Sequence, residues 1–212
     1  MSIGFRRGLP SLVLSSLLLA FAAPGDAADA PGHSKVPGKR LAKGLYTSPD
    51  GRFALRYGAW LLPGARFEEQ HVITASQAVY IADDFGKAYG VICTDTIGTG
   101  ITLERIAADL TVGELLKSKE FVTTGRGAEL RLTALHPGGS PIASRTREVG
   151  KWVEKPNDFY EALSIFIQRG AVYRVSAGVT PITGGSAEEL LARARQQLDR
   201  VLGSLEIPAP EH

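Results

Sequence analysis

Residues 159–205 read FYEALSIFIQRGAVYRVSAGVTPITGGSAEELLARARQQLDRVLGSL, and they hold the two clearest structural signals of the chain. Phe159 to Gln168 and Ala171 to Val179 are apolar runs separated only by Arg169-Gly170, a spacing typical of a β-hairpin. Each run has an apolar face at alternate positions, formed by Leu163, Ile165 and Ile167 in the first and by Tyr173, Val175 and Ala177 in the second. The stretch therefore opens with a predicted antiparallel pair of strands.

The second signal is a helix that follows the hairpin. Ser186 and Glu189 have the spacing of a capping box, in which the serine accepts from the N3 amide and the glutamate reaches back. Apolar residues then recur at steps of three and four, at Leu191, Ala194, Leu198, Val201, Leu202 and Leu205. The pattern predicts an amphipathic helix that stops near Gly203.

Toward the N-terminus, further segments have the alternation of β-strands. Arg52 to Tyr57 places Phe53, Leu55 and Tyr57 on one face, and Glu129 to Thr133 places Leu130 and Leu132 inward. Residues 67–95 predict two or three strands, with a hairpin turn at 83–86. Ser144 to Trp152 predicts one more strand, whose basic residues are typical of a sheet edge.

One region before the final hairpin has a helical pattern, roughly Thr102 to Lys119. Thr111 and Glu114 form a candidate capping box inside it, which would start a second helix at that point. Because the strands join through short turns and the clearest helix comes last, we predict the α+β class. The architecture is a largely antiparallel β-sheet flanked by helices, with a C-terminal amphipathic helix.

The same segments carry a resemblance to a known fold group. The strand Phe159 to Gln168, a return strand with Tyr173 and a long helix closing on residues 202–205 resemble the PsbP/Mog1-like fold, as do residues 50–55 followed by Trp60. That fold is an antiparallel sheet flanked by helices, and the resemblance implies a non-enzymatic accessory or binding protein. The chain departs from the group in placing Pro63 and Gly64 after Trp60 rather than before it, and no ligand residue of the group maps onto it.

The first residues have the pattern of an export signal. Arg6 and Arg7 precede an apolar run from Leu9 to Ala23, and small residues at 20–22 and 26–28 offer cleavage sites. The run is shorter than the roughly 20 residues that span a bilayer. We expect a signal peptide at 1–28 with cleavage between 22 and 30, a flexible leader at 29–43, a single globular α+β domain at 44–207 and a tail at 208–212. A retained anchor is the alternative, and the export route, general secretory or twin-arginine, stays open.

Composition narrows the classes of partner that we expect. The 212 residues carry a formal net charge of +2, with 22% charged residues of both signs interspersed. Nucleic-acid binding needs a concentrated basic face, so no nucleic-acid partner is expected. The expected location is periplasmic or secreted, with no membrane span in the mature form, and the partner is an unknown protein or small-molecule ligand.

Motifs that suggest chemistry have simpler explanations. Asp84-Phe85-Gly86 lacks the other kinase motifs and is typical of a turn, where Asp83 would also lie. Gly98-Thr99-Gly100 lacks the third glycine of a dinucleotide fingerprint. Cys93, the single cysteine, alternates with Tyr89 and Val91 as a small buried hydrophobe would, although a nucleophilic or redox role is the alternative. No catalytic, cofactor-binding or metal residue is assigned, and no cofactor is expected.

Three functional hypotheses follow. The first is an exported non-catalytic accessory or binding protein. The second is a small periplasmic hydrolase-like enzyme, whose site the fold assembles around His71 or His136 beside a Ser, Asp or Cys93. The third is a subunit of an envelope assembly, which an exposed apolar patch with Trp60 or Trp152 would support. The first residues to inspect for binding are Trp60, Trp152, Tyr160, Arg145 and Arg147, for which burial in a core is the alternative.

Overall fold

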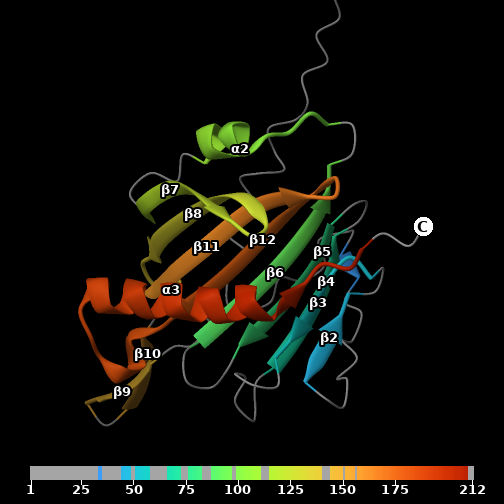
Figure 1. Cartoon of the computed structure of the whole chain (residues 1–212). Helices are drawn as coiled ribbons and strands as arrows, with labels where there is room; N and C mark the ends of the chain where they lie inside the picture. The colour runs from blue at the N-terminus through green and yellow to red at the C-terminus, as the bar shows by residue number, and fades with distance from the viewer. Residues whose placement is uncertain are drawn as a thin grey trace, which may run out of the picture.

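The computed structural model describes residues 33–34, 44–48, 51–57, 66–72, 76–82, 87–96, 99–110, 115–139, 144–149, 151–155 and 157–209. The α+β class predicted from the sequence is confirmed. The main element is an antiparallel eight-stranded sheet with the order β1-β4-β5-β6-β12-β11-β8-β7 (Figure 1). Its strands are β1 (His33–Ser34), β4 (Arg66–Val72), β5 (Ser76–Ala82), β6 (Lys87–Asp95), β7 (Leu116–Thr124), β8 (Gly127–His136), β11 (Phe159–Gln168) and β12 (Ala171–Val179).

Smaller elements flank this sheet. A three-stranded sheet joins β13 (Leu205–Glu206), β3 (Ala54–Arg56) and β2 (Leu45–Thr47), and a two-stranded sheet joins β9 (Ser144–Glu148) and β10 (Lys151–Lys155). The helices are α2 (Leu103–Asp109), α3 (Ala187–Ser204) and the short 3-10 turn η2 (Pro181–Thr183). Within the predicted leader 29–43, His33 and Ser34 pair with β4. No helix in the described part of the chain has the length and apolar character needed to cross a bilayer.

The predicted hairpin is confirmed as β11 and β12. Arg169 and Gly170 both have positive φ, at 51° and 72°, as a two-residue type I′ turn requires. Val175 lies opposite Ser164, and Leu163 lies opposite Ser176. The two predicted apolar faces therefore belong to opposite faces of the sheet.

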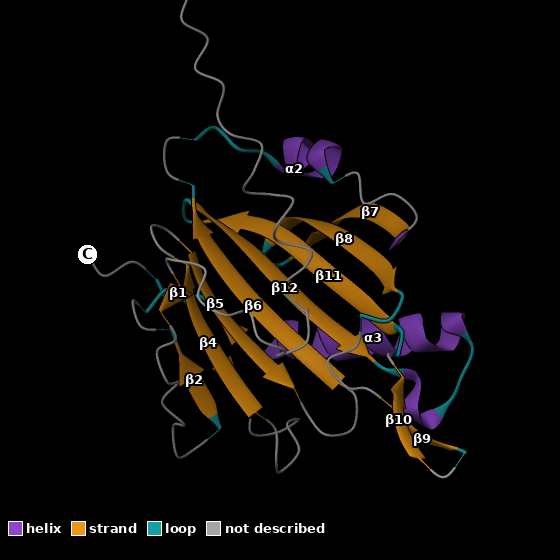
Figure 2. Cartoon of the chain, turned by 180° about the vertical axis from the view of Figure 1, so that it is seen from behind, coloured by secondary structure: helices purple, strands orange, loops and turns teal. Residues whose placement is uncertain are grey.

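Each sheet face has its own helix. Helix α3 packs over Phe166, Tyr173 and Val175, whereas α2 packs over the other face at Leu130 and Leu163. Figure 2, seen from behind, places α3 beyond the sheet. Because both faces are covered, every residue of β11 from Phe159 to Phe166 is buried.

The predicted C-terminal helix is confirmed, including its cap. Ser186 Oγ accepts from the Glu189 amide at 3.3 Å, and the Ser186 amide donates to Glu189 Oε2 at 2.9 Å. Gly203 lies inside the last turn, and the helix ends at Ser204. The buried face consists of Leu190, Ala194, Gln197, Leu198, Val201 and Leu202. Leu190 is thus buried in the first turn, while Leu191 is only partly buried.

The predicted helix from Thr102 to Lys119 is wrong in its second half. Helix α2 covers Leu103–Asp109 and is capped by Thr102, whereas Leu116–Lys119 belong to strand β7. The capping box at Thr111 and Glu114 lies outside the described residues. Pairing with β8 decides the conformation here, since tertiary contacts routinely override local propensity.

The single strand predicted for Ser144 to Trp152 is also wrong. The chain turns back after Glu148, so that β10 pairs with β9 from Lys151 opposite Glu148 onward. Val149, at φ 44°, supplies part of this turn. The two strands form their own sheet rather than an edge of the main one. The other strand predictions hold: residues 67–95 form three strands, and Phe53 and Leu55 are fully buried around β3.

Candidate functional site

His136 is the candidate histidine that the fold places in a defined polar contact. It ends β8, and its Nε2 lies 2.9 Å from Oε2 of Glu161 on β11. The two side chains are 16% and 1% exposed. Among the described residues Glu161 is the hydrogen-bond partner of this ring, and Glu161 Oε1 has none. A carboxylate in this position fixes the orientation and tautomer of the imidazole.

The sequence after His136 explains why the ring is held there. His136, Pro137, Gly138 and Gly139 form a turn in which the Gly139 amide donates to the His136 carbonyl at 3.1 Å. Pro at the second position and Gly138 at φ 64° at the third are the requirements of a type II turn. The Gly138 amide also donates to Asp158 Oδ1 at 3.1 Å. The turn therefore anchors the end of β8 against the start of β11.

The other candidate chemistry does not assemble around His136. The backbone of His71 lies on β4, five strands away, a spacing of about 24 Å across the sheet alone. Cys93 is fully buried on β6 with Tyr89 and Val91, as its alternation predicted. In the described residues no group of three or more His, Cys, Asp or Glu side chains could hold a metal. Asp83 and Asp84, placed in the predicted turn at 83–86, lie outside the described residues.

Of the residues considered for binding, the structure describes the side chain of Tyr160 alone. Tyr160 is 8% exposed and belongs to the core, so the core interpretation of this residue is confirmed. In the backbone register of β9 and β10, Trp152 lies opposite Arg147, and Arg145 lies opposite Glu154. The side chains of Trp152, Arg145 and Arg147, and the whole of Trp60, lie outside the described part of the chain.

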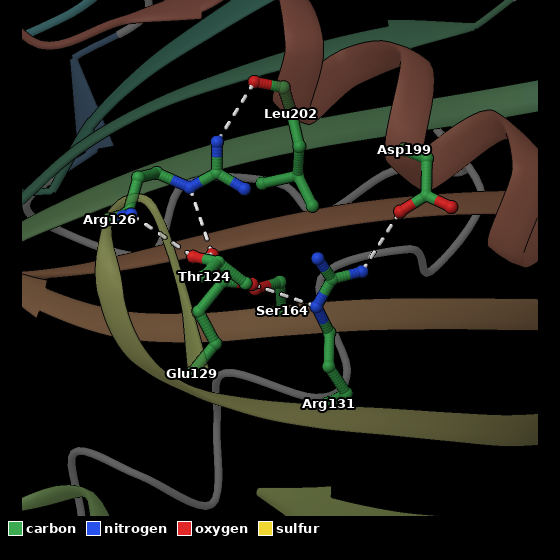
Figure 3. A network of polar contacts seen from close by, with 7 residues as sticks. All are labelled: Thr124, Arg126, Glu129, Arg131, Ser164, Asp199 and Leu202. Atoms are coloured by element: carbon green, nitrogen blue, oxygen red, sulfur yellow. Dashed lines mark hydrogen bonds and ion pairs between the residues drawn. The ribbon is translucent and has the colours of Figure 1, made fainter. Parts of the chain in front are cut away.

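Glu129 is the centre of a polar network that the sequence pattern did not reveal (Figure 3). Its carboxylate is fully buried on β8 and accepts four hydrogen bonds. Oε1 accepts from Thr124 Oγ1 at 2.6 Å and Arg126 Nε at 3.0 Å. Oε2 accepts from Arg131 Nε and Ser164 Oγ, both at 2.8 Å. A carboxylate saturated in this way has no lone pair left for a substrate.

The two arginines of the network connect the sheet to α3. Arg131 Nη1 lies 3.0 Å from Asp199 Oδ1, and Arg126 Nη1 donates to the Leu202 carbonyl at 3.4 Å (Figure 3). Arg126 also lies over the ring of Phe166, 5.5 Å from its centroid. A cation at the last carbonyls of a helix is favourable. The Glu129 network therefore fixes the C-terminal half of α3 against β7, β8 and β11.

The network predicts an acid-dependent stability. Burial alone would raise the pKa of Glu129, but the hydrogen bonds from Thr124 and Ser164 and the charges of Arg126 and Arg131 outweigh it, so the pKa lies below its usual 4.5. A folded-state pKa below the unfolded one gives stability that is present above pH 4.5 and lost as pH falls through the folded pKa. Urea unfolding from pH 7 to 3 should show this loss, and the loss should be smaller in Glu129→Gln. If the free energy of unfolding fell equally with pH in the wild type and in Glu129→Gln, this prediction would be contradicted.

Beside the network lies an open groove between α3 and the strands β7, β8 and β11, with a volume of about 190 Å³. Ser118 Oγ and Thr133 Oγ1 lie 2.6 Å apart in its floor, and Arg195 of α3 reaches Ser118 Oγ at 3.5 Å. Its polar lining comprises Ser118, Glu120, Arg131, Thr133, Arg195 and Asp199.

Strand β7 borders this groove and ends the sheet. It is nine residues long, and no described strand pairs with its outer edge. Its exposed positions include Lys117, Lys119, Glu120 and Phe121, the last of which is 53% exposed. An unpaired edge presents backbone donors and acceptors to a partner. We therefore take the edge of β7 together with the groove as the candidate binding site.

Comparison with known proteins adds a likeness of fold. Neither the protein-family models nor the curated proteins include a match to this chain. Among solved structures, the chain is similar to the cyanobacterial PsbP protein (CyanoP) of Synechocystis sp. PCC 6803, with 13% identity and a TM-score of 0.45 over 81% of this chain and 96% of that one. The match is to a protein of the fold group that the sequence resembles.

Proposed function

We propose that this chain is an exported, non-catalytic binding protein that docks an extended segment of another protein on the edge of β7. The observation that carries the proposal is the nine-residue strand β7, whose outer edge pairs with none of the described strands, beside a preformed polar groove. A segment that adds as a further strand gains main-chain hydrogen bonds, and pockets for its alternate side chains give specificity. Export rests on the signal-peptide pattern of residues 1–28.

The edge is also protected against indiscriminate pairing, which supports a selective role. The register of β7 against β8 shifts between Leu116 and Ser118, the mark of a bulge at Lys117. Bulges and lysines on edge strands keep identical apolar strands from adding. A partner must therefore match this edge in shape and charge.

The alternative enzyme needs a Ser, an Asp or Cys93 beside a candidate histidine. In the described residues His136 contacts Glu161 instead, and Cys93 lies on β6 in the core. The edge and groove favour binding over a hydrolase built on His136. An envelope assembly is compatible with the proposal, because its subunit would supply the extended segment.

The test is a selection of random peptides on the immobilised full-length protein, followed by hydrogen exchange of the complex. Selected peptides should slow the exchange of amides in 116–124, because their backbone would pair with β7. Peptides that protect only other segments, or a selection that enriches no sequence, would overturn the proposal. A scrambled version of each selected peptide is the control for composition.

A further inference from the structure

Phe121 on β7 is a large apolar side chain that the fold leaves half in solvent. It is 53% exposed, although its neighbour across the ladder, Leu130 of β8, is fully buried. Aromatic side chains are enriched in the cores of protein interfaces. The inference from this residue rests on the proposed function, in which an added strand would run beside Phe121.

The two faces of β7 differ in character. Phe121 lies opposite Leu130, on the sheet face that α2 covers, whereas Glu120 lies opposite Arg131, on the face that α3 covers. Because alternate residues of a strand point to opposite faces, an added strand would meet Phe121 on one face and the polar groove on the other. Cross-strand pairs of an aromatic residue with a β-branched or second aromatic residue stabilise a sheet. The face of the segment over Phe121 should therefore be apolar.

The groove on the other face is polar, but its charges balance. Its lining contains two arginines and two carboxylates, which are Arg131, Arg195, Glu120 and Asp199. Arg131 is held by Asp199 and by the buried Glu129 (Figure 3). Arg195 donates to the Ser118 hydroxyl at 3.5 Å, and its guanidinium carries further N–H donors. A charged side chain that entered would leave water for a lining with no net charge, and burial of a charge without a counter-charge is costly.

The size and chemistry of the groove fit one uncharged polar side chain. Its volume of about 190 Å³ is below the roughly 300 Å³ at which pockets for separate small ligands begin. Hydroxyl groups and arginine donors lie beside carboxylate acceptors in its lining. A carboxamide has an acceptor oxygen and an NH₂ donor, so it can bind both kinds of group without bringing a charge.

We infer that the segment bound at β7 is an amphipathic strand of another protein, with β-branched or aromatic side chains over Phe121 and carboxamides toward the groove. The two requirements come from opposite faces of one strand, so the two kinds of side chain alternate along the segment. A second copy of β7 fits less well, because its own groove face carries Glu120 and would add a carboxylate to a lining that already balances.

The experiment uses four labelled synthetic peptides that test the two faces separately: TVQVQVQVT, TVEVEVEVT, TVKVKVKVT and TAQAQAQAT. Fluorescence anisotropy with the full-length protein should show the tightest binding for the first peptide, with the glutamate and lysine peptides each about threefold weaker because their charges lose water. The alanine peptide should also bind about threefold more weakly, because it lacks a β-branched partner for Phe121. Binding of the first peptide should change less than about twofold between 0.05 and 0.5 M salt, since salt screens charge interactions.

A substitution of the exposed aromatic residue tests the apolar face. Phe121→Thr should weaken binding of TVQVQVQVT by about fivefold, the size of a cross-strand aromatic pair, while keeping a residue that favours strands. Ile182→Thr is the matched control, because this side chain is 50% exposed on η2, outside β7 and the groove lining. It should change binding less than about twofold, as a surface substitution away from the site does.

A substitution in the lining tests the charge balance of the groove. Glu120→Gln leaves two arginines and one carboxylate there, so TVEVEVEVT should bind about threefold more tightly, as for an exposed ion pair. Glu188→Gln is the matched control, since Glu188 is exposed in the first turn of α3 outside the lining. It should leave the affinity for this peptide within about twofold.

The contrary outcomes separate the inference from the proposed function. Equal or tighter binding of the glutamate or lysine peptide, or equal effects of Phe121→Thr and Ile182→Thr, would overturn the inference. If library-selected peptides still protected 116–124 from exchange in that case, the proposed function would stand without it. If no peptide protected this segment, the proposed function would fail as well. A dimer in sedimentation velocity that Phe121→Thr dissociates would assign the edge to a second copy and overturn the inference.

Discussion

Gly178→Ala should destabilise the fold by about 3 kcal/mol, the upper range for overpacking a core. A Cβ atom on Gly178 would lie 2.1, 2.5 and 2.7 Å from Cζ, Cε1 and Cε2 of Phe159. The ring is fully buried, and it neighbours the imidazole of His136 at a centroid distance of 6.2 Å. The added methyl group would therefore force a movement of the end of β11. Urea unfolding followed by fluorescence measures the change.

Two further variants test this explanation. Phe159→Leu removes the three atoms that the methyl group would meet, so Gly178→Ala should cost at least 1 kcal/mol less in that background, a coupling of the size seen for contacting residues. Gly203→Ala is the matched control: it lies in α3, and apart from its chain neighbours and the nearby helix backbone nothing lies within 4 Å of its Cβ position. It should stabilise by at most about 0.5 kcal/mol, less than Gly-to-Ala in a helix interior, because Gly203 lies in the last turn of α3. If the losses of stability from Gly178→Ala and Phe159→Leu simply add in the double variant, the steric explanation would be contradicted.

The elements that sequence predicted well are those whose signals are local. The turn at Arg169-Gly170 fixes the register of β11 and β12, and the capping box at Ser186 fixes the start of α3. The helix prediction for Leu116–Lys119 was wrong for the opposite reason. Their conformation depends on pairing with Leu132, Thr133 and Ala134 of β8, which follow only after the intervening turn.

The buried acids could not be predicted from strand alternation. With Leu130 and Leu132 facing one side, Glu129 and Arg131 should face water, as on a sheet with one solvated face. Here α3 returns from about 70 residues further along to cover that face, which buries Glu129. The available signal was that six of the eight residues from Phe159 to Phe166 are apolar and lie at both odd and even positions, which is typical of a strand covered on both faces. The candidate binding edge was missed as well, because most of β7 was assigned neither to a helix nor to a strand.

Glu129→Gln should destabilise the fold by about 3 kcal/mol, as expected when one partner of a buried ion pair is removed. The amide oxygen can replace one acceptor, but the NH₂ group would face donors from Thr124 and Arg126 or from Arg131 and Ser164. Glu120→Gln is the matched control: the same substitution on exposed β7, next to Arg131, should change the free energy of unfolding by less than about 0.5 kcal/mol.

The pH dependence of this difference separates charge from packing. At neutral pH the wild type has its full ionic contribution, because the pKa of Glu129 is lowered by the network despite its burial. As pH falls through that pKa, the wild type loses this contribution and the glutamine variant has none to lose. The stability difference between the two should therefore narrow toward pH 3. A difference that stays constant across this range would show that Glu129 acts by shape and hydrogen bonding alone, and that its charge does not fix α3 to the sheet.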